Sequence, residues 1–372
     1  MKLTIERTAL LTSLSHVQSV VERRNTIPIL ANILMDARDG FLGLTATDLD
    51  IAINEKVAAN IDAEGATTIP AHLLYDIIRK LPEGSQVELD YKAAEERIYV
   101  RSGQSKFALA CLPQDDFPVM ETNQLPHNFV LSGNILKRLI DKTRFAISTE
   151  ETRYYLNGIY LHTAETEGVP MLRAVATDGH RLARVETPVP SDAEGMPGVI
   201  VPRKAVSEVL RLIDERDEPV SISLSETKIC FSFGDTILTS KLIDGTFPDY
   251  ERVIPAGNDK VLELDGKSFA QAVDRVSTVA TEKTRAIKLS LSNDLITLSA
   301  TGAEAGSATE EVAATYSADE MEIGFNSKYL LDITGQIDGE NARFLFADAG
   351  SPTIVRDSAD EGALYVLMPM RV

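Results

Sequence analysis

The chain repeats one structural plan three times, at a spacing of roughly 120 residues. Each repeat opens with an alternating strand pattern that runs into an amphipathic helix pattern, at residues 1–21, 127–147 and 260–280. A second strand-to-helix step follows at residues 67–81, 199–213 and 321–337. Alternating strands then close each repeat, at residues 105–118, 236–250 and 353–370. A period of this length is typical of whole domains and too long for a solenoid unit, so the sequence predicts three similar domains in tandem.

The predicted domains cover residues 1–124, 125–253 and 254–372, and proline-marked extended segments join them. Each is expected to be an α+β domain, an antiparallel sheet with two helices on one face, because amphipathic helices must cover the apolar side of a sheet. The helices are predicted at residues 7–18, 71–81, 134–146, 203–213, 267–276 and 326–337. Open sheet edges invite pairing, so we expect the sheets to continue across the joints. The two end edges are then free to meet a second copy, and head-to-tail pairing that closes makes a ring.

The charge of the chain limits how it can bind nucleic acid. It has 56 acidic and 37 basic side chains, a formal net charge of -19. Overall charge therefore does not hold this protein on nucleic acid, because phosphate binding requires Lys and Arg to replace counterions. The predicted helices nevertheless carry an excess of basic residues, while the rest of the chain is strongly acidic. Two interpretations stay open: these side chains solvate exposed helix faces, or they form one mildly basic surface that meets a polyanion loosely.

Cysteine usage and hydropathy indicate the compartment. Cys111 and Cys230 lie far apart in alternating apolar stretches, which predicts buried free thiols and no disulfide framework. The first residues lack a signal-peptide pattern, and no stretch approaches the ~18 apolar residues of a membrane helix. We expect a cytoplasmic protein.

No enzyme motif is present in the sequence. It contains no phosphate-binding loop, dinucleotide fingerprint, zincin helix or nucleophile elbow, and its histidines have no metal-ligand spacing. Asp178 and His180 are the nearest approach to an acid/base pair, but a turn at Asp178-Gly179 explains them more simply. We expect no catalytic residue, no metal and no cofactor.

Several long motifs resemble one family over the whole chain and in order. They are RYYLNGIYL (153–161), ATDGHRLA (176–183), VIVPRKAV (199–206), SKLIDGTFPDYERVIP (240–255), EMEIGFNSKYLLD (320–332) and YVLMPMRV (365–372). With the triplication, they resemble the bacterial DNA polymerase sliding clamp, the β subunit of the DNA polymerase III holoenzyme. The resemblance implies a head-to-tail homodimer that closes into a ring, with helices inside and sheet outside. Duplex DNA would thread the hole without sequence preference, and retention would be topological.

The resemblance also implies a pocket on domains two and three that binds peptides of the replicative polymerase, the clamp loader and other DNA-processing enzymes. Carried over by position, the pocket comprises Leu156, Thr177, Gly179, His180, Arg181, Leu182, Pro248, Arg252, Val253, Asn326, Tyr329, Val366, Met368, Pro369, Met370 and Arg371. Leu, Val, Met and Pro would line an apolar cleft that adapts to varied partners. Without the resemblance, residues 365–372 read as a final core strand. Thr284 and Gly350 stand where some relatives have bulkier apolar residues, which predicts a more open side of the pocket.

The resemblance assigns DNA contact to Arg24, Tyr154 and Tyr155, with the tyrosines stacking on exposed bases or packing on a strand. The basic helix residues Lys137, Arg138, Arg203 and Lys204 are the other candidates for DNA contact. His72 and Glu150 stand where some relatives have Arg or an amide. The predicted dimer interface comprises Phe107, Leu109, Val279, Arg97, Arg101, Lys106, Glu304, Glu310 and Glu311. Apolar contact and strand pairing should dominate there, since surface ion pairs are individually weak.

Three functions therefore compete. The first is a ring-shaped processivity factor without catalytic activity that tethers its partners to DNA. The second is a peptide-binding scaffold that does not encircle DNA. The third is an enzyme that uses Asp178 and His180.

Overall fold

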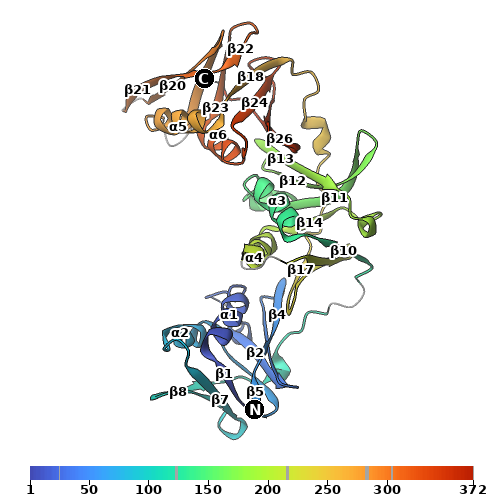
Figure 1. The fold of residues 1–372 in the computed structure, drawn as a ribbon, viewed down its shortest axis with the longest axis vertical. Coiled ribbons are helices and arrows are strands. Elements are labelled where there is room, and N and C mark those ends of the chain that lie inside the picture. The colour runs from blue at the N-terminus through green and yellow to red at the C-terminus, as the bar shows by residue number, and fades with distance from the viewer. Residues whose placement is uncertain (25, 122–124, 215–217, 281–284, 303–304, 372) are drawn as a thin grey trace. The chain divides into compact units, whose positions relative to one another are not determined.

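The computed structural model describes residues 1–24, 26–121, 125–214, 218–280, 285–302 and 305–371. The strand–helix step recurs in all three thirds of the chain (Figure 1). The helices are α1 (Arg7–Gln18), α2 (Ala71–Lys80), α3 (Gly133–Arg144), α4 (Arg203–Asp214), α5 (Gly266–Ser277) and α6 (Ser327–Thr334). All six predicted helices are therefore confirmed, and differences are confined to their ends. The last helix is shorter than predicted because it ends at Gly335, whose N–H bonds back to the carbonyls of Leu331 and Ile333.

The chain forms two compact bodies. The first contains residues Met1–Leu136, Pro190–Ala193 and Lys204–Leu242. Its five-stranded sheet has the order β5 (Asn60–Ala63), β1 (Lys2–Glu6), β7 (Gln86–Lys92), β8 (Arg97–Ser102) and β9 (Ser105–Ala110). Its eight-stranded sheet has the order β10 (His127–Leu131), β15 (Val220–Leu224), β16 (Lys228–Phe233), β17 (Thr236–Lys241), β4 (Ile51–Ala58), β3 (Phe41–Thr47), β2 (Asn32–Arg38) and β6 (Gly65–Pro70).

The second body contains residues Lys137–Val189, Glu194–Arg203 and Ile243–Val372. Its nine-stranded sheet has the order β14 (Val199–Pro202), β11 (Gly158–Thr166), β12 (Val169–Thr177), β13 (Arg181–Pro188), β26 (Asp360–Leu367), β25 (Thr353–Asp357), β24 (Asn341–Phe346), β18 (Lys260–Asp265) and β22 (Thr315–Tyr316). Its four-stranded sheet has the order β21 (Gly306–Ala313), β20 (Leu295–Gly302), β19 (Ala286–Ser292) and β23 (Met321–Asn326).

The sheets run through both predicted joints. In the first body, β17 of the middle third pairs with β4 of the first third, with Leu238 opposite Ile53. In the second body, β13 of the middle third pairs with β26 of the last third, with Leu182 opposite Val366. Both pairings are antiparallel. The prediction that sheets continue across the joints is confirmed.

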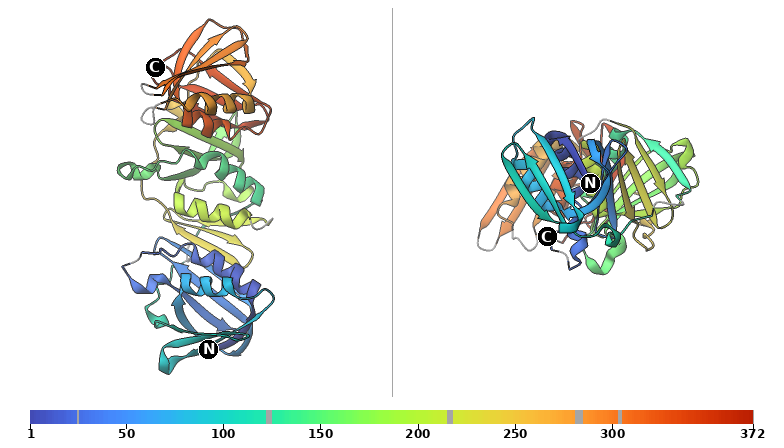
Figure 2. Two further views of the ribbon diagram at one scale, coloured as in Figure 1. Left: turned by 90° about the vertical axis from the view of Figure 1, so that its left-hand side faces the viewer. Right: turned by 90° about the horizontal axis from the view of Figure 1, so that it is seen from below.

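The helices cover the sheets as their sequences predict. In α5, Asp265 caps the helix by accepting a hydrogen bond from the Ser268 N–H, at 2.6 Å. Phe269, Val273 and Val276 recur on one face of α5 and are buried. Figure 2 shows α1 beside α2 and α5 beside α6, in each case against the strands of their own body.

The two cysteines are buried free thiols, as predicted. Burial raises the pKa of both Cys111 and Cys230, so neither is primed as a thiolate nucleophile.

Candidate functional site

An apolar pocket of about 300 Å³ lies where β13 meets β26 in the second body. Leu182 and Val366 are opposite each other in this strand pair, and both are almost fully buried. The lining residues are Arg153, Tyr155, Leu156, Thr177, Gly179, Arg181, Leu182, Pro248, Asp249, Tyr250, Val253, Val366 and Met368. Since the two strands belong to different thirds of the chain, the pocket depends on the sheet that joins them.

A packed cluster of buried side chains supports the floor of the pocket. Leu156, Leu182, Tyr250 and Val366 belong to it. Phe247, another member, stacks on the ring of Tyr160 with centroids 4.8 Å apart and planes at 8°. Because these residues interlock, the floor is preformed and does not have to be ordered by a ligand.

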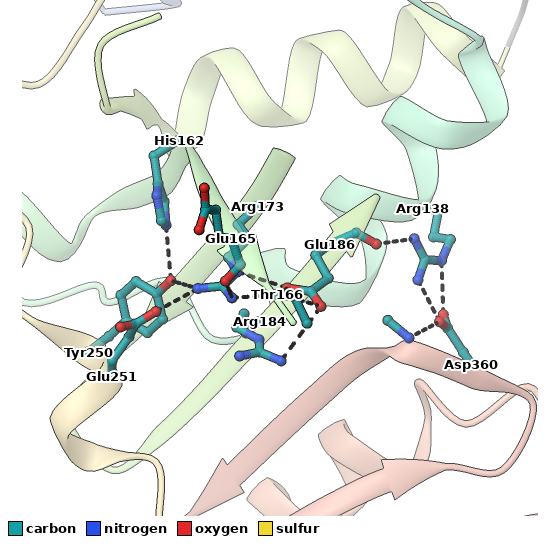
Figure 3. Close-up of polar contacts among 11 residues, drawn as sticks. Arg138, His162, Glu165, Thr166, Arg173, Arg184, Glu186, Tyr250, Glu251 and Asp360 are labelled. Atoms are coloured by element: carbon teal, nitrogen blue, oxygen red, sulfur yellow. Dashed lines mark hydrogen bonds and ion pairs between the residues drawn. The ribbon is translucent and has the colours of Figure 1, made fainter. Parts of the chain in front are cut away.

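A buried polar network holds the wall that carries Tyr250 (Figure 3). The Arg173 guanidinium donates to the Glu186 carboxylate at 2.8 Å, to the Tyr250 hydroxyl at 3.0 Å and to the Glu251 carboxylate at 2.6 Å. It also donates to the carbonyl of Glu165 and the hydroxyl of Thr166. All five N–H groups of the guanidinium are therefore used. Arg173 ties β12, β13 and the short helix Tyr250–Val253 into one rigid wall.

His162 completes this network on the other side of Tyr250. Its Nδ1 lies 3.0 Å from the Thr163 carbonyl, which can only accept, so Nδ1 carries the hydrogen. In the neutral ring, Nε2 then accepts from the Tyr250 hydroxyl at 3.0 Å. Burial and the charge of Arg173 lower the pKa of His162, so the neutral form that this geometry needs is favoured.

The charged side chains in the lining are all in ion pairs. Arg153 bonds to Glu150 through two nitrogens, at 2.8 and 2.7 Å. Arg181 bonds to Asp178 and Asp332, and its guanidinium carbon lies 4.5 Å from the centre of the Tyr329 ring. Asp249 pairs with Arg252 at 2.6 Å. The lining therefore combines an apolar floor with a rim whose charges are internally neutralised.

The C-terminal segment leaves the core just where it reaches the pocket. Strand β26 ends at Leu367, and Met368 is 41% exposed while its N–H donates to the His180 carbonyl. The Met370 N–H donates to the Gly324 carbonyl at 2.7 Å. Residues up to Leu367 are thus a core strand, and the next residue, Met368, lines the pocket.

The structure brings most of the predicted pocket residues together. The predicted residues found in the lining are Leu156, Thr177, Gly179, Arg181, Leu182, Pro248, Val253, Val366 and Met368. The others lie outside the lining: His180, Arg252, Asn326, Tyr329, Pro369, Met370 and Arg371. Several of these flank it, since the His180 ring stacks on Tyr329 and the Asn326 side chain caps α6.

Sequence reasoning missed Arg153, Tyr155, Asp249 and Tyr250 as lining residues. All four lie within the motifs of residues 153–161 and 240–255, but only the fold shows that they line the pocket. Thr284 lies outside the described residues. Gly350 sits in a turn that Asp348 closes by accepting from the Gly350 N–H at 2.8 Å.

The Asp178–His180 segment is a turn, as the simpler explanation predicted. The Asp178 carboxylate accepts from the backbone N–H groups of His180 and Arg181, at 2.9 and 3.1 Å. Gly179 has a φ of +87°. This left-handed conformation favours glycine at the turn. Asp178 thus serves the backbone of the turn and is not poised against the His180 ring.

The candidate DNA residues divide into two groups. Arg24, Arg203 and Tyr154 are exposed, and Lys137 is half-buried beside Asp141. Tyr155, by contrast, contributes to the pocket.

Arg138 and Lys204, two of the candidates for DNA contact, also have partners within the chain. Arg138 forms two hydrogen bonds with Asp360 and one with the Glu186 carbonyl. The Lys204 ammonium bonds to Asp48 at 2.5 Å and to the Val20 carbonyl. These side chains join segments from different thirds of the chain.

Other basic side chains of the helices also form hydrogen bonds within the protein. Arg7 donates to the carbonyls of Ile78 and Arg79, and Lys142 donates to the carbonyl of Gln336. The helices therefore present less unneutralised positive charge than the number of their Lys and Arg residues suggests. His72 occupies a position where some relatives have Arg or an amide. Its ring nitrogens lie within hydrogen-bonding distance of the Gln18 side chain and the Val21 carbonyl.

The candidate interface residues lie at and beside two sheet edges. Strand β9, with Phe107 and Leu109, is the last strand of its sheet, and β21, with Glu310 and Glu311, is the first of another. Two of the expected intermolecular charges have partners within the chain: Arg101 bonds to Glu88 at 3.0 Å, and Glu310 bonds to Arg275. Arg97 and Lys106 are exposed, Val279 is half-buried, and Glu304 lies outside the described residues.

Metal-binding clusters and membrane-spanning helices are both missing from the described part of the chain. Among the described residues, no cluster of three or more His, Cys, Asp or Glu side chains is placed to hold a metal ion. No helix in the described part of the chain has the length and apolar character to span a membrane.

Three repeats of a sheet with two helices, sheets continuous through the joints and an apolar pocket at one joint define a clamp-type subunit. Three family models agree with this class. They describe the N-terminal, central and C-terminal domains of the DNA polymerase III beta subunit and match residues 1–121, 130–249 and 251–371.

Curated relatives and solved structures point to the same family. The chain is 55% identical over 372 residues to the beta sliding clamp of Caulobacter vibrioides (strain NA1000 / CB15N) and 42% identical over 375 residues to that of Escherichia coli (strain K12), covering 100% of both chains in each comparison. A crystal structure of the C. crescentus beta sliding clamp matches with a TM-score of 0.98 and 55% identity, covering 100% of this chain and 99% of the other. A Bartonella birtlesii sliding clamp bound to griselimycin matches with a TM-score of 0.97 and 51% identity, covering 100% of both.

The chain belongs to the family of bacterial sliding clamps, the DNA polymerase III beta subunits. The family resemblance inferred from the motifs is confirmed. The function is that of a DNA sliding clamp, and the scaffold that does not encircle DNA is not favoured.

Proposed function

We propose that two copies of this chain close head to tail into a ring around duplex DNA and hold the replicative polymerase and other DNA-processing proteins on it. The observation that carries this proposal is the continuity of the sheets through both joints, with end strands β9 and β21 left at two sheet edges. Pairing of β9 in one copy with β21 in the other would extend the same pattern through the intermolecular joints. Phe107, Leu109 and Val279 supply the apolar contact in this model.

The ring explains how an acidic chain works on DNA. A net charge of -19 disfavours tight phosphate binding, and several helix cations are committed to the joints. A closed ring does not depend on affinity, because its retention is topological. Arg24, Arg203 and Lys137 then provide loose contacts, and Tyr154, which is 53% exposed, can stack on an unpaired base.

The apolar pocket is proposed as the site for partner peptides. Leu182, Val253, Val366 and Met368 offer a preformed apolar surface beside the neutralised rim. The crystal structure of the B. birtlesii clamp bound to griselimycin supports ligand binding by this fold. Large apolar anchors of the polymerase or clamp loader would carry most of the binding free energy.

The remaining assignments follow from this function. The chain acts as a tether without catalysis, in the cytoplasm where the chromosome is replicated. Its domains span residues 1–124, 125–253 and 254–372, and the family-model matches to residues 1–121, 130–249 and 251–371 support these limits.

The ring is tested by loading the protein on plasmid DNA. On closed circles, retention should survive salt that removes freely bound protein, because topology is not screened. Linearising the circle should release the protein. Retention on linear DNA with open ends would refute encirclement, and the scaffold would then be the better account.

The pocket is tested by removing Met368–Val372. Strand β26 ends before this segment, so the fold and the dimer should persist. Calorimetric titration with a short peptide carrying Leu and Phe anchors should show binding to the full chain and none to the truncated chain. Equal affinity for both proteins would mean that this pocket is not the peptide site.

A further inference from the structure

The pocket presents cationic side chains but leaves none of them available for an incoming anion. Arg181 is held by Asp178 and Asp332, and its planar face lies on Tyr329. Arg153 is held by Glu150 through its Nε and one terminal nitrogen. An acidic side chain of a ligand must therefore compete with a carboxylate that is already in place.

The two arginines differ in how firmly they are held. The Arg181 side chain is 7% exposed and also donates to the Phe145 carbonyl at 2.7 Å. The Arg153–Glu150 pair is open to solvent, with side-chain exposures of 32% and 53%. Exposed pairs are weak and exchange partners at little cost. Arg153 is the lining cation whose partner a ligand can most easily replace.

Glu150 is well placed to control this exchange. It lies three residues before Arg153, at the start of the short helix Glu151–Leu156, which delivers Arg153, Tyr155 and Leu156 to the pocket. The Arg153 side chain also lies against the Gly179 turn, which confines it to the pocket wall. The hydrogen bonds from Arg153 lower the pKa of Glu150, so the carboxylate stays ionised and competes with any acidic ligand at neutral pH.

We propose that Glu150 sets the charge preference of the peptide pocket by occupying Arg153, so that the pocket selects peptides that are neutral at the position facing this arginine. This inference rests on the proposed peptide site and specifies its ligand class as peptides with apolar anchors and no acidic side chain at that position. Replacing Glu150 by a neutral residue would free the Arg153 guanidinium and shift the preference towards acidic peptides.

The chain supplies a matched control for this test. Glu151 is the adjacent carboxylate, is exposed and has no ion pair to Arg153, which is bound by Glu150. Glu150→Gln and Glu151→Gln therefore change net charge equally, at neighbouring positions. Only Glu150→Gln weakens the hold on Arg153.

The probes are synthetic peptides with one Leu-Phe anchor pair, in which a single Gln or Glu is placed in turn at each flanking position. Titration calorimetry gives the Gln-to-Glu affinity ratio for each position on each protein. At one position, Glu150→Gln should shift this ratio about fivefold towards the Glu peptide at low salt, and the shift should shrink in high salt. Glu151→Gln should leave the ratio as in the unaltered chain. The double variant Glu150→Gln/Arg153→Gln should lose the shift.

The outcomes separate this inference from the peptide site itself. Equal ratios for Glu150→Gln and Glu151→Gln at every position would overturn the role of Glu150 while leaving the pocket intact. A shift that persists in the double variant would show that it does not act through Arg153, which also overturns it. If the Gln peptides fail to bind the unaltered chain, the peptide site is refuted and this inference falls with it.

Discussion

Replacing Arg173 by Met should loosen the wall of the pocket without unfolding the protein. Arg173 is 3% exposed and bonds to Glu186, Tyr250 and Glu251. Met fills most of the space of the arginine stem but removes the charge and all five donors. Glu186, which is 6% exposed, then keeps a buried charge whose nearest remaining cation is Arg184, at 3.9 Å.

The size of the effect follows from these contacts. Breaking a buried ion pair by removing one partner costs about 3–5 kcal/mol, because the other charge is left uncompensated. Arg184 and the Thr166 hydroxyl still face Glu186 in the variant. The expected loss in the free energy of unfolding is therefore near the lower limit, about 3 kcal/mol. Amide hydrogens in β12 and β13 should then exchange about a hundredfold faster, since each 1.4 kcal/mol is about a factor of ten. Peptide affinity should fall severalfold, because the wall carrying Tyr250 is less well ordered before binding.

Two variants show whether the charge is responsible. Arg173→Lys keeps the charge but offers fewer donors, so it should lose less protection than Arg173→Met. Arg173→Met/Glu186→Gln removes the stranded charge and should recover part of the loss. If the double variant exchanges as fast as Arg173→Met, lost packing explains the effect and the argument from buried charge is refuted. If neither variant changes peptide affinity, the network does not order the pocket.

Three further predictions concern other parts of the molecule. Phe107→Asp should convert the dimer to monomers in sedimentation, because it would bury a charge in the proposed joint, and an unchanged dimer would place the joint elsewhere. Burial and the charge of Arg173 lower the pKa of His162, so the unfolded chain binds more protons than the folded chain below about pH 6.5, and the stability should fall as the pH drops through that range, by up to about 1.4 kcal/mol per pH unit; His162→Asn, which cannot titrate, should have a flatter profile of melting temperature against pH, and an unchanged profile would refute this origin. Lys142→Met should destabilise by about 3–5 kcal/mol, since the ammonium is buried among three carboxylates within 4 Å, whereas Lys137→Met on the more exposed face should change the melting temperature little.

The fold was predictable because local and global signals agree. Strand–helix steps recur in each third of the chain, and a capping residue such as Asp265 stands where a predicted helix begins. The apolar residues of α5 repeat at helical spacing and are the residues that the structure buries. Helix ends were less certain because a turn such as that at Gly335 depends on backbone bonds that no periodicity reveals.

The pocket was only partly predictable because it is made by long-range pairing. Leu182 and Val366 are neighbours through the β13–β26 pair, and no local pattern relates residues so far apart. The family motifs supplied most of the lining, but Tyr250 was not assigned to it although it lies within the motif of residues 240–255. Its position follows from the bond to Arg173, and a single sequence does not show which buried cation meets which hydroxyl.

The charges of the helices could not be interpreted from counting alone. A basic side chain on a helix can face solvent, bind an anion or bond to a neighbouring segment of the chain. The sequence alone does not distinguish these three cases. Arg138 and Lys204 illustrate the third outcome, since both bond to carboxylates from another third of the chain.

This use of charge has a functional consequence. A clamp that binds phosphates strongly would slide slowly, because each neutralised phosphate adds to the affinity that must be overcome at every step. Arg138, Lys142 and Lys204 bond to carboxylates within the chain, which strengthens the joints and neutralises part of the positive charge that these side chains could offer to DNA. A ring that holds DNA by topology needs rigid joints more than affinity. We therefore expect these three side chains to serve retention by stabilising the bodies that enclose DNA, and to slow sliding less than unpaired cations would.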